Sequence, residues 1–506
     1  MSSFWRRFFT VEAVVLLSTI VGATEYQEGV PNGRTAAAAI KKPLLGYQLD
    51  ISRDKVPTMK TLYRIVDLLA ACGYNCFQLY MEHTFAYKGH EEAWANASPL
   101  TAEEIRALDD YCAERGIELV PNQNSFGHLE KWLELPRYRQ LAEVPGGGFP
   151  KKGTTMWLKQ AHALCPTDPK AFEFIISLWD DLTPNFRSKM LTIHCDEVWD
   201  LESDGHGRSW QEVMKKGSQY VWLDFVKKLC AAAEQRGRTV LLDDDMFVRH
   251  YPELISKLPS NVIAIDWNYG RRPPGKDFAA TTLRLKEAGI PYVVQCGTSG
   301  WTSLTGRHAN MTNNVREGVT YGRQNGALGF IMSEWGDGGH CQPWITTLPA
   351  LVYLSHAVKD EWIDDVRLAT EVDRLTGTVC GQALLRYQNL YLLDGKPEAG
   401  YMSELYRRLS QGEQWMRPDH GMTDEDMKAI FAEWQSAKDS LDLKDAPDWV
   451  RDGFATMDLL LESLKLRWKG EHERVRCEMP PRYRALWLRH NRPGGLDDSV
   501  KQVFSR

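Results

Sequence analysis

Two adjacent acids, Asp196 and Glu197, form the sharpest chemical feature of the sequence. They directly follow the apolar run KMLTIHC (189–195), which has the pattern of a buried strand. Neighbouring side chains on a straight strand point to opposite faces, so both acids can enter one pocket only where the strand ends and turns. Two carboxyl groups that lie close together can take two roles, one holding its proton while the other stays ionised. Hydrolysis of a glycosidic bond needs such a pair of acidic roles.

The pattern of a short apolar run followed by polar or aromatic residues occurs eight times. The runs cover residues 44–51, 75–81, 117–123, 189–195, 239–245, 262–268, 291–297 and 327–333. At or just after their ends lie the other candidate site residues, which are Asp50, Glu82, His83, His128, His194, Trp267, Trp301, Glu334, Trp335 and Asp337. Buried charges are costly without partners, so a region that gathers so many of them indicates a functional site.

These eight runs alternate with helical patterns, which predicts a parallel sheet. Eight strands close a (β/α)8 TIM barrel, an α/β fold whose active sites lie at the C-terminal ends of the strands. The alternative is an open, doubly wound sheet. Such a sheet normally carries a glycine-rich loop after its first strand, and LDISRDKVP (49–57) contains no glycine. We therefore expect the barrel.

The domain organisation follows from where the strand patterns begin and end. We expect a linker over residues 24–43, the catalytic barrel over 44–350 and a helical C-terminal domain over 351–506, because strand patterns stop after Pro349. A capping box, Thr101 with Glu104, predicts the start of one barrel helix. The Pro-Gly-Gly turn at 493–495 is expected to end a helix and dock the C-terminal segment.

The N-terminus and the cysteines point to different compartments. Residues 1–23 have the basic start and apolar run of a signal peptide, which favours export to the periplasm or the extracellular space. The ten cysteines show no metal-binding or disulfide spacing, which favours buried thiols in a reducing cytoplasm. The mature chain has no run long and apolar enough to span a membrane. Its formal net charge of −6 argues against a nucleic-acid partner.

Three segments together resemble the catalytic barrel of the β-N-acetylhexosaminidases, glycoside hydrolase family 20. They are the Asp196-Glu197 pair, PNQNSFGH (121–128) and CPTDPKAF (165–172), and the likeness extends over about residues 44–350. It implies a carbohydrate substrate and substrate-assisted retaining hydrolysis of a terminal β-linked N-acetylhexosamine, GlcNAc or GalNAc. Glu197 would be the general acid and base, and Asp196 would hold the acetamido N–H while the acetamido oxygen forms an oxazolinium ion. No cofactor is needed.

The resemblance also implies roles for residues around the acids. Glu82 and His128 would form a relay to Glu197, with His83 as the alternative member. The remaining candidates would bind the sugar, and they are Asp50, His194, Trp267, Trp301, Glu334, Trp335 and Asp337, with His340 able to share the role of Asp337. Three Trp residues at successive strand ends are suited to form an aromatic box around the N-acetyl methyl.

The chain departs from the family pattern at two sugar-binding positions and in its N-terminal region. Leu45 stands where the family has an Arg for the sugar hydroxyls, so Arg53 or Arg271 would have to replace it. No Tyr for the acetamido carbonyl is evident in QCGTSGW (295–301), and the usual preceding α+β domain is not found. A retaining glycosidase with a carboxylate nucleophile, such as Glu334, and a non-catalytic sugar-binding barrel therefore remain as alternatives.

The consecutive acids Asp243, Asp244 and Asp245 are the remaining cluster. Three neighbouring carboxylates on a strand cannot all face one ion, so we expect no metal site there. Asp243 or Asp245 would instead bond the sugar or orient a neighbouring side chain.

Overall fold

The computed structural model describes residues 36–150, 157–270, 272–393, 402–410 and 422–505. Eight parallel strands form one sheet in the order β3-β2-β1-β10-β9-β8-β7-β6. They are β1 (Leu44–Asp50), β2 (Cys76–Tyr80), β3 (Glu118–Val120), β6 (Met190–His194), β7 (Thr239–Asp243), β8 (Val262–Trp267), β9 (Tyr292–Gly297) and β10 (Gly329–Glu334). A parallel bridge between Asn122 and Thr192 joins the two edges. The predicted TIM barrel is confirmed, and each expected run contains one strand.

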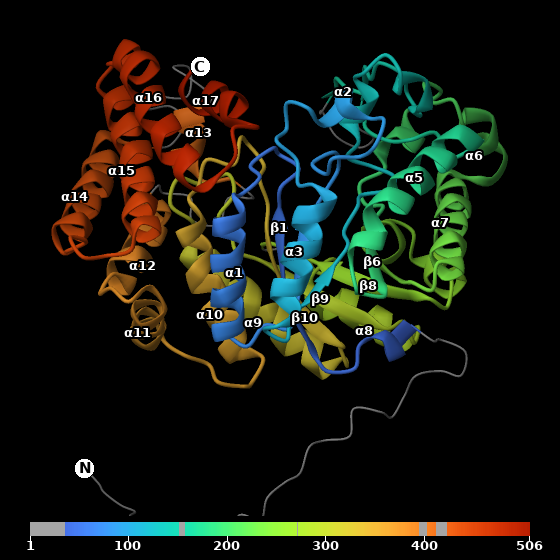
Figure 1. Ribbon diagram of the computed structural model, residues 1–506, viewed down its shortest axis with the longest axis horizontal. Coiled ribbons are helices and arrows are strands. Elements are labelled where there is room, and N and C mark those ends of the chain that lie inside the picture. The colour runs from blue at the N-terminus through green and yellow to red at the C-terminus, as the bar shows by residue number, and fades with distance from the viewer. Residues whose placement is uncertain (1–35, 151–156, 271, 394–401, 411–421, 506) are drawn as a thin grey trace, which may run out of the picture.

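Helices cover the outside of the barrel because their apolar faces pack on the strands (Figure 1). The barrel helices are α1 (Met59–Ala71), α3 (Ala102–Ala113), α5 (Pro169–Leu182), α7 (Ser218–Gln235), α8 (Phe278–Glu287), α9 (His308–Gln324) and α10 (Leu348–Ala357). The capping box of Thr101 and Glu104 starts α3, as predicted. Asp168 caps α5, where Pro169 occupies the first turn.

Shorter elements fill the connections on the catalytic side. They are α2 (Glu91–Trp94), α4 (Glu130–Leu133), α6 (Trp210–Lys216) and the hairpin of β4 (Phe149–Pro150) with β5 (Trp157–Leu158). The segment after β3 is the longest of these connections, and it carries His128, Glu130 and His162 toward the end of β6. This connection therefore supplies residues to the site rather than to the barrel wall.

The C-terminal part is helical, as predicted, and lies beside the barrel (Figure 1). Its helices are α11 (Asp365–Thr376), α12 (Gly381–Asn389), α13 (Glu404–Ser410), α14 (Asp424–Asp439), α15 (Asp448–Trp468), α16 (His472–His490) and α17 (Leu496–Phe504). The preceding helix α10 spans the predicted division at residue 350 and packs on α9.

The Pro-Gly-Gly turn joins this helical part to the first barrel loop. It follows the end of α16, where Arg492 N–H donates to the Val56 carbonyl at 2.8 Å. Gly494 N–H donates to Ser98 Oγ at 3.0 Å. A Cβ on Gly494 would lie 2.3 Å from the Ala97 carbonyl oxygen, so only glycine allows this close approach. The docked turn fixes the loop that begins at Arg53.

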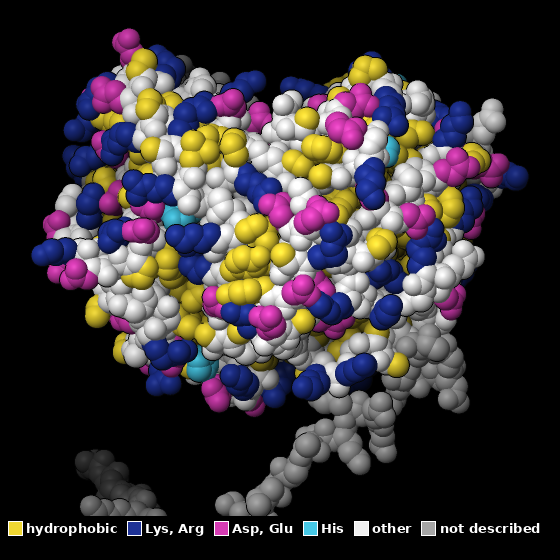
Figure 2. Space-filling model, in the orientation of Figure 1, with side chains coloured by type: hydrophobic (Ala, Val, Ile, Leu, Met, Phe, Trp, Pro, Cys, Tyr) yellow, Lys and Arg dark blue, Asp and Glu magenta, His cyan; other side chains and the backbone are white. Residues whose placement is uncertain are grey.

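The predicted signal peptide and most of the predicted linker lie outside the described residues. Within the linker range, Ala36–Ala39 form a short 3-10 helix, and Ala36 packs among apolar residues at the N-terminal end of the strands. None of the ten cysteines, all of which are described, forms a disulfide, and only Cys477 is exposed. In the part of the chain that is described, every helix is too short or too polar to cross a membrane. Acidic and basic side chains are interspersed over the face in Figure 2.

Candidate active site

The turn after β6 places Asp196 and Glu197 on the same side of the barrel wall. The strand shifts register between Thr192 and His194, and His194, Cys195 and Glu197 all have left-handed φ values of 54°, 66° and 52°. Each such residue costs about 1–2 kcal/mol, so surrounding contacts must hold the turn. Asp245 Oδ2 accepts the Glu197 N–H at 3.1 Å. The turn thus removes the opposed orientation that a straight strand would impose.

His128 lies between the two acids. Its Nε2 is 3.4 Å from Asp196 Oδ2 and 3.7 Å from Glu197 Oε2. Burial alone would lower the pKa of His128, but the Asp196 and Glu130 carboxylates raise it to about 10. Burial would likewise raise the pKa of Asp196, but the charge and hydrogen bond of His128 hold it well below its usual range. A charged imidazole beside an ionised Asp196 is therefore the state at neutral pH.

A hydrogen bond from Asn124 also orients the Asp196 side chain. Asn124 Nδ2 donates to Asp196 Oδ1 at 3.2 Å, and Tyr80 Oη accepts from the same amide at 3.1 Å. Gly127 lies against the backbone of the turn, where an added Cβ would be 2.7 Å from the Asp196 carbonyl oxygen. The segment PNQNSFGH therefore packs directly on the acidic turn.

Both acids line a cavity of about 610 Å³, which is large enough for a sugar unit and part of its neighbour. Among the residues that line it are the predicted His128, Asp196, Glu197, Trp267, Trp301, Trp335 and Asp337. Residues that were not predicted from the sequence also line it, and among them are Tyr80, Trp199, Arg249, Tyr269, Arg272 and Met402. Glu197 is partly exposed to this cavity, whereas Asp196 is nearly buried.

Aromatic rings form the wall beside the acids. Trp267 stacks on Tyr269 with ring centroids 5.3 Å apart, and Tyr269 meets the edge of Trp301 at 5.2 Å. Trp335 joins this group at 6.3 Å from Tyr269 and continues it to Tyr80 at 4.8 Å. Tyr269 could have been found from the sequence, because it is an aromatic residue two positions after Trp267, the last residue of β8.

Arg53 occupies the polar side of the cavity. Its guanidinium lies 3.1 Å from Glu82, 3.2 Å from Asp50 and 3.2 Å from Asp337. The structure thus brings Arg53 into the cavity that the missing family Arg would serve. Arg271, the other predicted substitute, lies outside the described residues.

The contacts of Glu82 differ from the predicted relay. Glu82 Oε1 interacts with Arg53 and accepts a hydrogen bond from Tyr80 Oη at 3.0 Å. Burial raises the pKa of Glu82 to about 7, although the charge of Arg53 opposes this shift. His83, the alternative member, pairs with Asp54 at 2.8 Å instead. Arg53 competes for Glu82 because β1 and β2 are neighbours and their ends meet.

Three predicted sugar-binding residues are buried in the wall and do not line the cavity. His194 Nδ1 contacts Asp243 at 2.6 Å, and its Nε2 contacts Asn122 Oδ1 at 2.8 Å. Asp50 accepts from Ser52 and from Gly336 N–H at 2.8 Å. Glu334 accepts from Thr298, from Gln342 at 2.6 Å and from Thr347 at 2.9 Å. These side chains brace the strand ends, because their polar atoms already have partners.

The acids after β7 form a buried cluster with one cation. Asp244 lies 2.8 Å from Arg249, and Asp266 lies 3.6 Å from the same guanidinium. Burial, and to a smaller extent the negative charge of Asp196, raises the pKa of Asp245 well above its usual range. The Asp245 carboxyl group contacts the acidic turn by accepting the Glu197 backbone N–H.

Among the described residues, two groups of ligating side chains come close enough together for a cation, His128 with Glu130 and His162, and His194 with Asp196 and Asp243. In the first group, His162 Nδ1 faces Glu130 and its Nε2 faces the Glu197 carbonyl. In the second group, both nitrogens of His194 contact oxygen atoms. The histidines of both groups are therefore engaged in hydrogen bonds that a metal ion would have to replace.

Comparisons with known proteins find similarity to one family of glycosyl hydrolases. Residues 45–284 match the family model described as the catalytic domain of glycosyl hydrolase family 20. The chain is similar to Hexosaminidase D of Bos taurus, with 23% identity over 339 residues that cover 62% of this chain and 92% of that protein. It is also similar to Hexosaminidase D of Homo sapiens, with 25% identity over 221 residues that cover 42% of each chain.

Among solved structures, the chain is similar to a chitobiase of Flavobacterium johnsoniae, with a TM-score of 0.53 and 15% identity over 92% of this chain and 78% of that chain. At this identity the likeness concerns the fold. The family match begins in β1 and ends in α8, so it includes the turn after β6 and the segment PNQNSFGH.

Proposed function

We propose that this chain, whose residues 45–284 match the catalytic domain of glycosyl hydrolase family 20, releases a terminal β-linked N-acetylhexosamine by substrate-assisted retaining catalysis. The observation that carries the proposal is the placement of Asp196 and Glu197 in one cavity, both facing His128. The aromatic wall beside them is suited to one face of a sugar.

In this mechanism, Glu197 protonates the glycosidic oxygen while the acetamido oxygen of the substrate attacks the anomeric carbon. The glycosidic C–O bond breaks, the leaving alcohol takes the proton of Glu197, and an oxazolinium ion forms. The negative charge that appears on Glu197 then lies 3.7 Å from the His128 imidazolium. This proximity stabilises the charge as it develops.

Asp196 has the complementary role. Because His128 keeps it ionised, its carboxylate can accept the acetamido N–H and offset the positive charge of the oxazolinium ion. In the second half of the reaction, Glu197 takes a proton from water, and the hydroxyl opens the oxazolinium ion with overall retention. Tyr269 and the Trp residues would surround the acetamido methyl, and Arg53 with Asp337 would bind sugar hydroxyls.

The decisive experiment assays the parent chain and Glu197→Gln on 4-nitrophenyl N-acetyl-β-glucosaminide and N-acetyl-β-galactosaminide. We expect parent activity on at least one sugar and a loss of kcat/KM of about 100- to 10,000-fold in the variant. Activity that survives the substitution would end the assignment of the acid. An inactive parent on both sugars would favour a sugar-binding barrel without catalysis.

A thiazoline that mimics the oxazolinium ion separates this mechanism from one with a carboxylate nucleophile. We expect it to inhibit the parent competitively and far more tightly than N-acetylglucosamine does, since it resembles the bound intermediate. Weak inhibition by the thiazoline, together with trapping of a glycosyl-enzyme by a 2-fluoro sugar, would indicate an enzyme nucleophile instead.

A further inference from the structure

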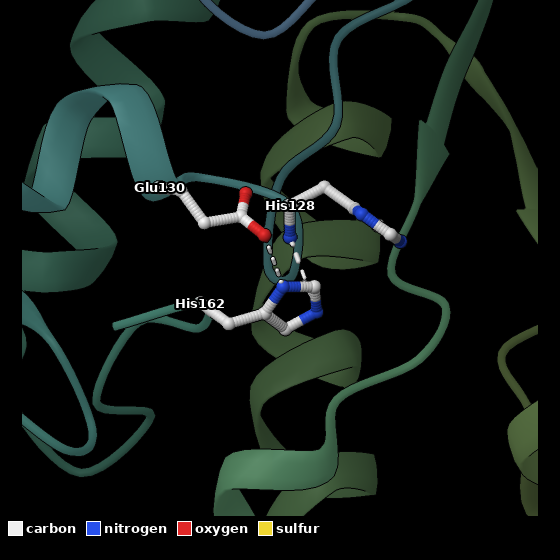
Figure 3. Close-up of side chains that lie close together, drawn as sticks. All are labelled: His128, Glu130 and His162. Carbon is white, nitrogen blue, oxygen red and sulfur yellow. Dashed lines mark hydrogen bonds and ion pairs between the residues drawn. The ribbon is translucent and has the colours of Figure 1, made fainter. Parts of the chain in front are cut away.

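A second histidine–carboxylate pair, Glu130 with His162, lies behind the acidic turn. His162 Nδ1 is 2.8 Å from Glu130 Oε1, and Figure 3 shows the carboxylate and the ring facing each other. The other nitrogen, Nε2, is 3.0 Å from the carbonyl oxygen of Glu197. This pair therefore reaches the backbone of the proposed acid, whereas His128 reaches its side chain.

The hydrogen-bond partners of His162 indicate which of its ring nitrogens carry a hydrogen. A carbonyl oxygen can only accept, so Nε2 must carry a hydrogen to bond the Glu197 carbonyl. Burial alone would raise the pKa of Glu130, but the charge of His162 lowers it to about 2, so this carboxylate also accepts. His162 thus donates at both nitrogens.

Of the neighbouring groups of His162, the Asp200 carboxylate agrees with this arrangement, and the His128 backbone N–H, a donor directed at Nε2, competes with it. The Asp200 carboxylate accepts the His162 backbone N–H at 3.3 Å and lies near the imidazole. The His128 backbone N–H also approaches Nε2, but at a longer distance of 3.5 Å. The shorter contact, at 3.0 Å, is the one to the Glu197 carbonyl.

Glu197 is consequently held at both of its backbone polar groups. Asp245 accepts its N–H, and its C=O accepts from His162 Nε2 at 3.0 Å and from the Trp199 backbone N–H at 2.8 Å, on either side of a Cα with a φ of 52°. Fixing the two peptide planes fixes the direction of the Cα–Cβ bond and hence the carboxyl group. Without these contacts, a left-handed glutamate would relax to a less strained conformation.

We propose that His162, oriented by Glu130, is a positioning residue that aims the Glu197 carboxyl at the glycosidic oxygen. This inference rests on the proposed function, since it assumes that Glu197 is the acid. It assigns the pair no contact with substrate.

The test compares substrates that need the acid to different degrees. A phenyl N-acetyl-β-glucosaminide has a poor leaving group, so its cleavage depends on protonation of the glycosidic oxygen. The 2,4-dinitrophenyl glycoside has a good leaving group, because 2,4-dinitrophenolate departs without being protonated. kcat/KM reports oxazolinium formation for both substrates. We expect His162→Ala to lower kcat/KM for the phenyl glycoside by about 100-fold, the effect of a misplacement of roughly 1 Å, and for the dinitrophenyl glycoside by less than about fivefold.

Two further variants and one control make the result specific. His162→Gln keeps an N–H that can donate to the Glu197 carbonyl, so it should recover part of the phenyl activity. Glu130→Gln keeps an acceptor for Nδ1 but removes its charge, and it should give an intermediate loss. His308→Ala removes another buried histidine, paired with Asp365 at 2.8 Å outside the cavity, and should affect both glycosides equally.

The outcomes separate the two proposals. Equal losses on both glycosides in His162→Ala and His162→Gln, with the same fall in Tm as His308→Ala, would overturn the positioning role and leave the proposed function intact. Unchanged activity in the His162 variants would likewise overturn the positioning role and leave the proposed function intact. A parent chain inactive on every glycoside would overturn the proposed function and this inference with it.

Discussion

The ends of the neighbouring strands β6 and β7 carry the same residue type in opposite electrostatic settings. Asp196, after β6, faces His128 at 3.4 Å, and its pKa falls well below the usual range. Asp245, after β7, has no cation within ion-pair distance among the described residues, and burial raises its pKa well above the usual range. At Asp196 the charge and hydrogen bond of His128 outweigh burial, whereas at Asp245 the charge of Arg249 opposes burial only in part.

The two strand ends also depend on each other. Asp245 accepts the N–H of Glu197, so a carboxyl group whose pKa is raised by burial supports the turn that carries Asp196. A second ionised carboxylate there would repel Asp196 at short range. This contrast predicts that the activity depends on the carboxylate charge of Asp196. At Asp245 it predicts that the activity depends only on an oxygen atom that accepts the Glu197 N–H.

Asp196→Asn should have the largest effect. The amide keeps the size of the side chain but removes the charge that would offset the oxazolinium ion, and we expect kcat/KM to fall by about 100- to 1,000-fold. Steady-state kinetics on the better of the two 4-nitrophenyl N-acetylhexosaminides measures this loss. Retention of more than about one-tenth of the parent activity would contradict an electrostatic role for Asp196.

His128→Gln should shift the pH dependence as well as the rate. Without the imidazolium, the pKa of Asp196 rises, so the acidic limb of the kcat/KM profile should move to higher pH, with a loss of about 10- to 100-fold at neutral pH. An acidic limb that stays in place would show that His128 does not control the ionisation of Asp196.

The same variant has a predicted stability signature. The pKa of His128 is raised to about 10, so its pairing stabilises the fold fully below its unfolded pKa of about 6.5 and is lost as the pH rises toward 10. Asp196 contributes above its unfolded pKa of about 3.9 and loses this contribution as the pH falls. The Tm difference between parent and His128→Gln should therefore be largest near pH 5–6 and shrink toward pH 10.

Asp245→Asn should have the smallest effect and serves as the matched control for Asp196→Asn. The amide oxygen can still accept the Glu197 N–H, so kcat/KM should change by less than about fivefold, or about 1 kcal/mol. Activity and thermal unfolding at neutral pH measure this directly. A loss as large as that of Asp196→Asn would mean that Asp245 is ionised and that the contrast between the two strand ends is wrong.

Much of the fold could be predicted because its signals are local. Apolar runs with helical patterns between them identified all eight strands, and the contacts of Thr101 with Glu104 depend only on residues within one helical turn. The position of Asp196 and Glu197 after β6 followed in the same way, as did the Trp residues after β8, β9 and β10. Their catalytic and binding roles stay predictions.

The partners of individual polar side chains could not be predicted. Glu82 and Glu334 both lie at strand ends, yet Glu82 contacts Arg53, and Glu334 is enclosed by Thr298, Gln342 and Thr347. His162 has no strand pattern near it, since it lies in the long connection after β3, and its contact with Glu197 spans 35 residues. Nothing local distinguishes such a histidine from one on the surface.

The sequence alone therefore determined the barrel, its helical C-terminal part and the position of two acids directly after a strand. It could do so because hydrophobic periodicity and helix caps depend on residues only a few positions apart. The tertiary structure decided which acid is ionised, which residues face the cavity and which backbone groups are held. Those properties depend on the stagger of strands around the barrel and on long connections that return to it. They arise only when distant segments share one buried environment, where charge and desolvation act together.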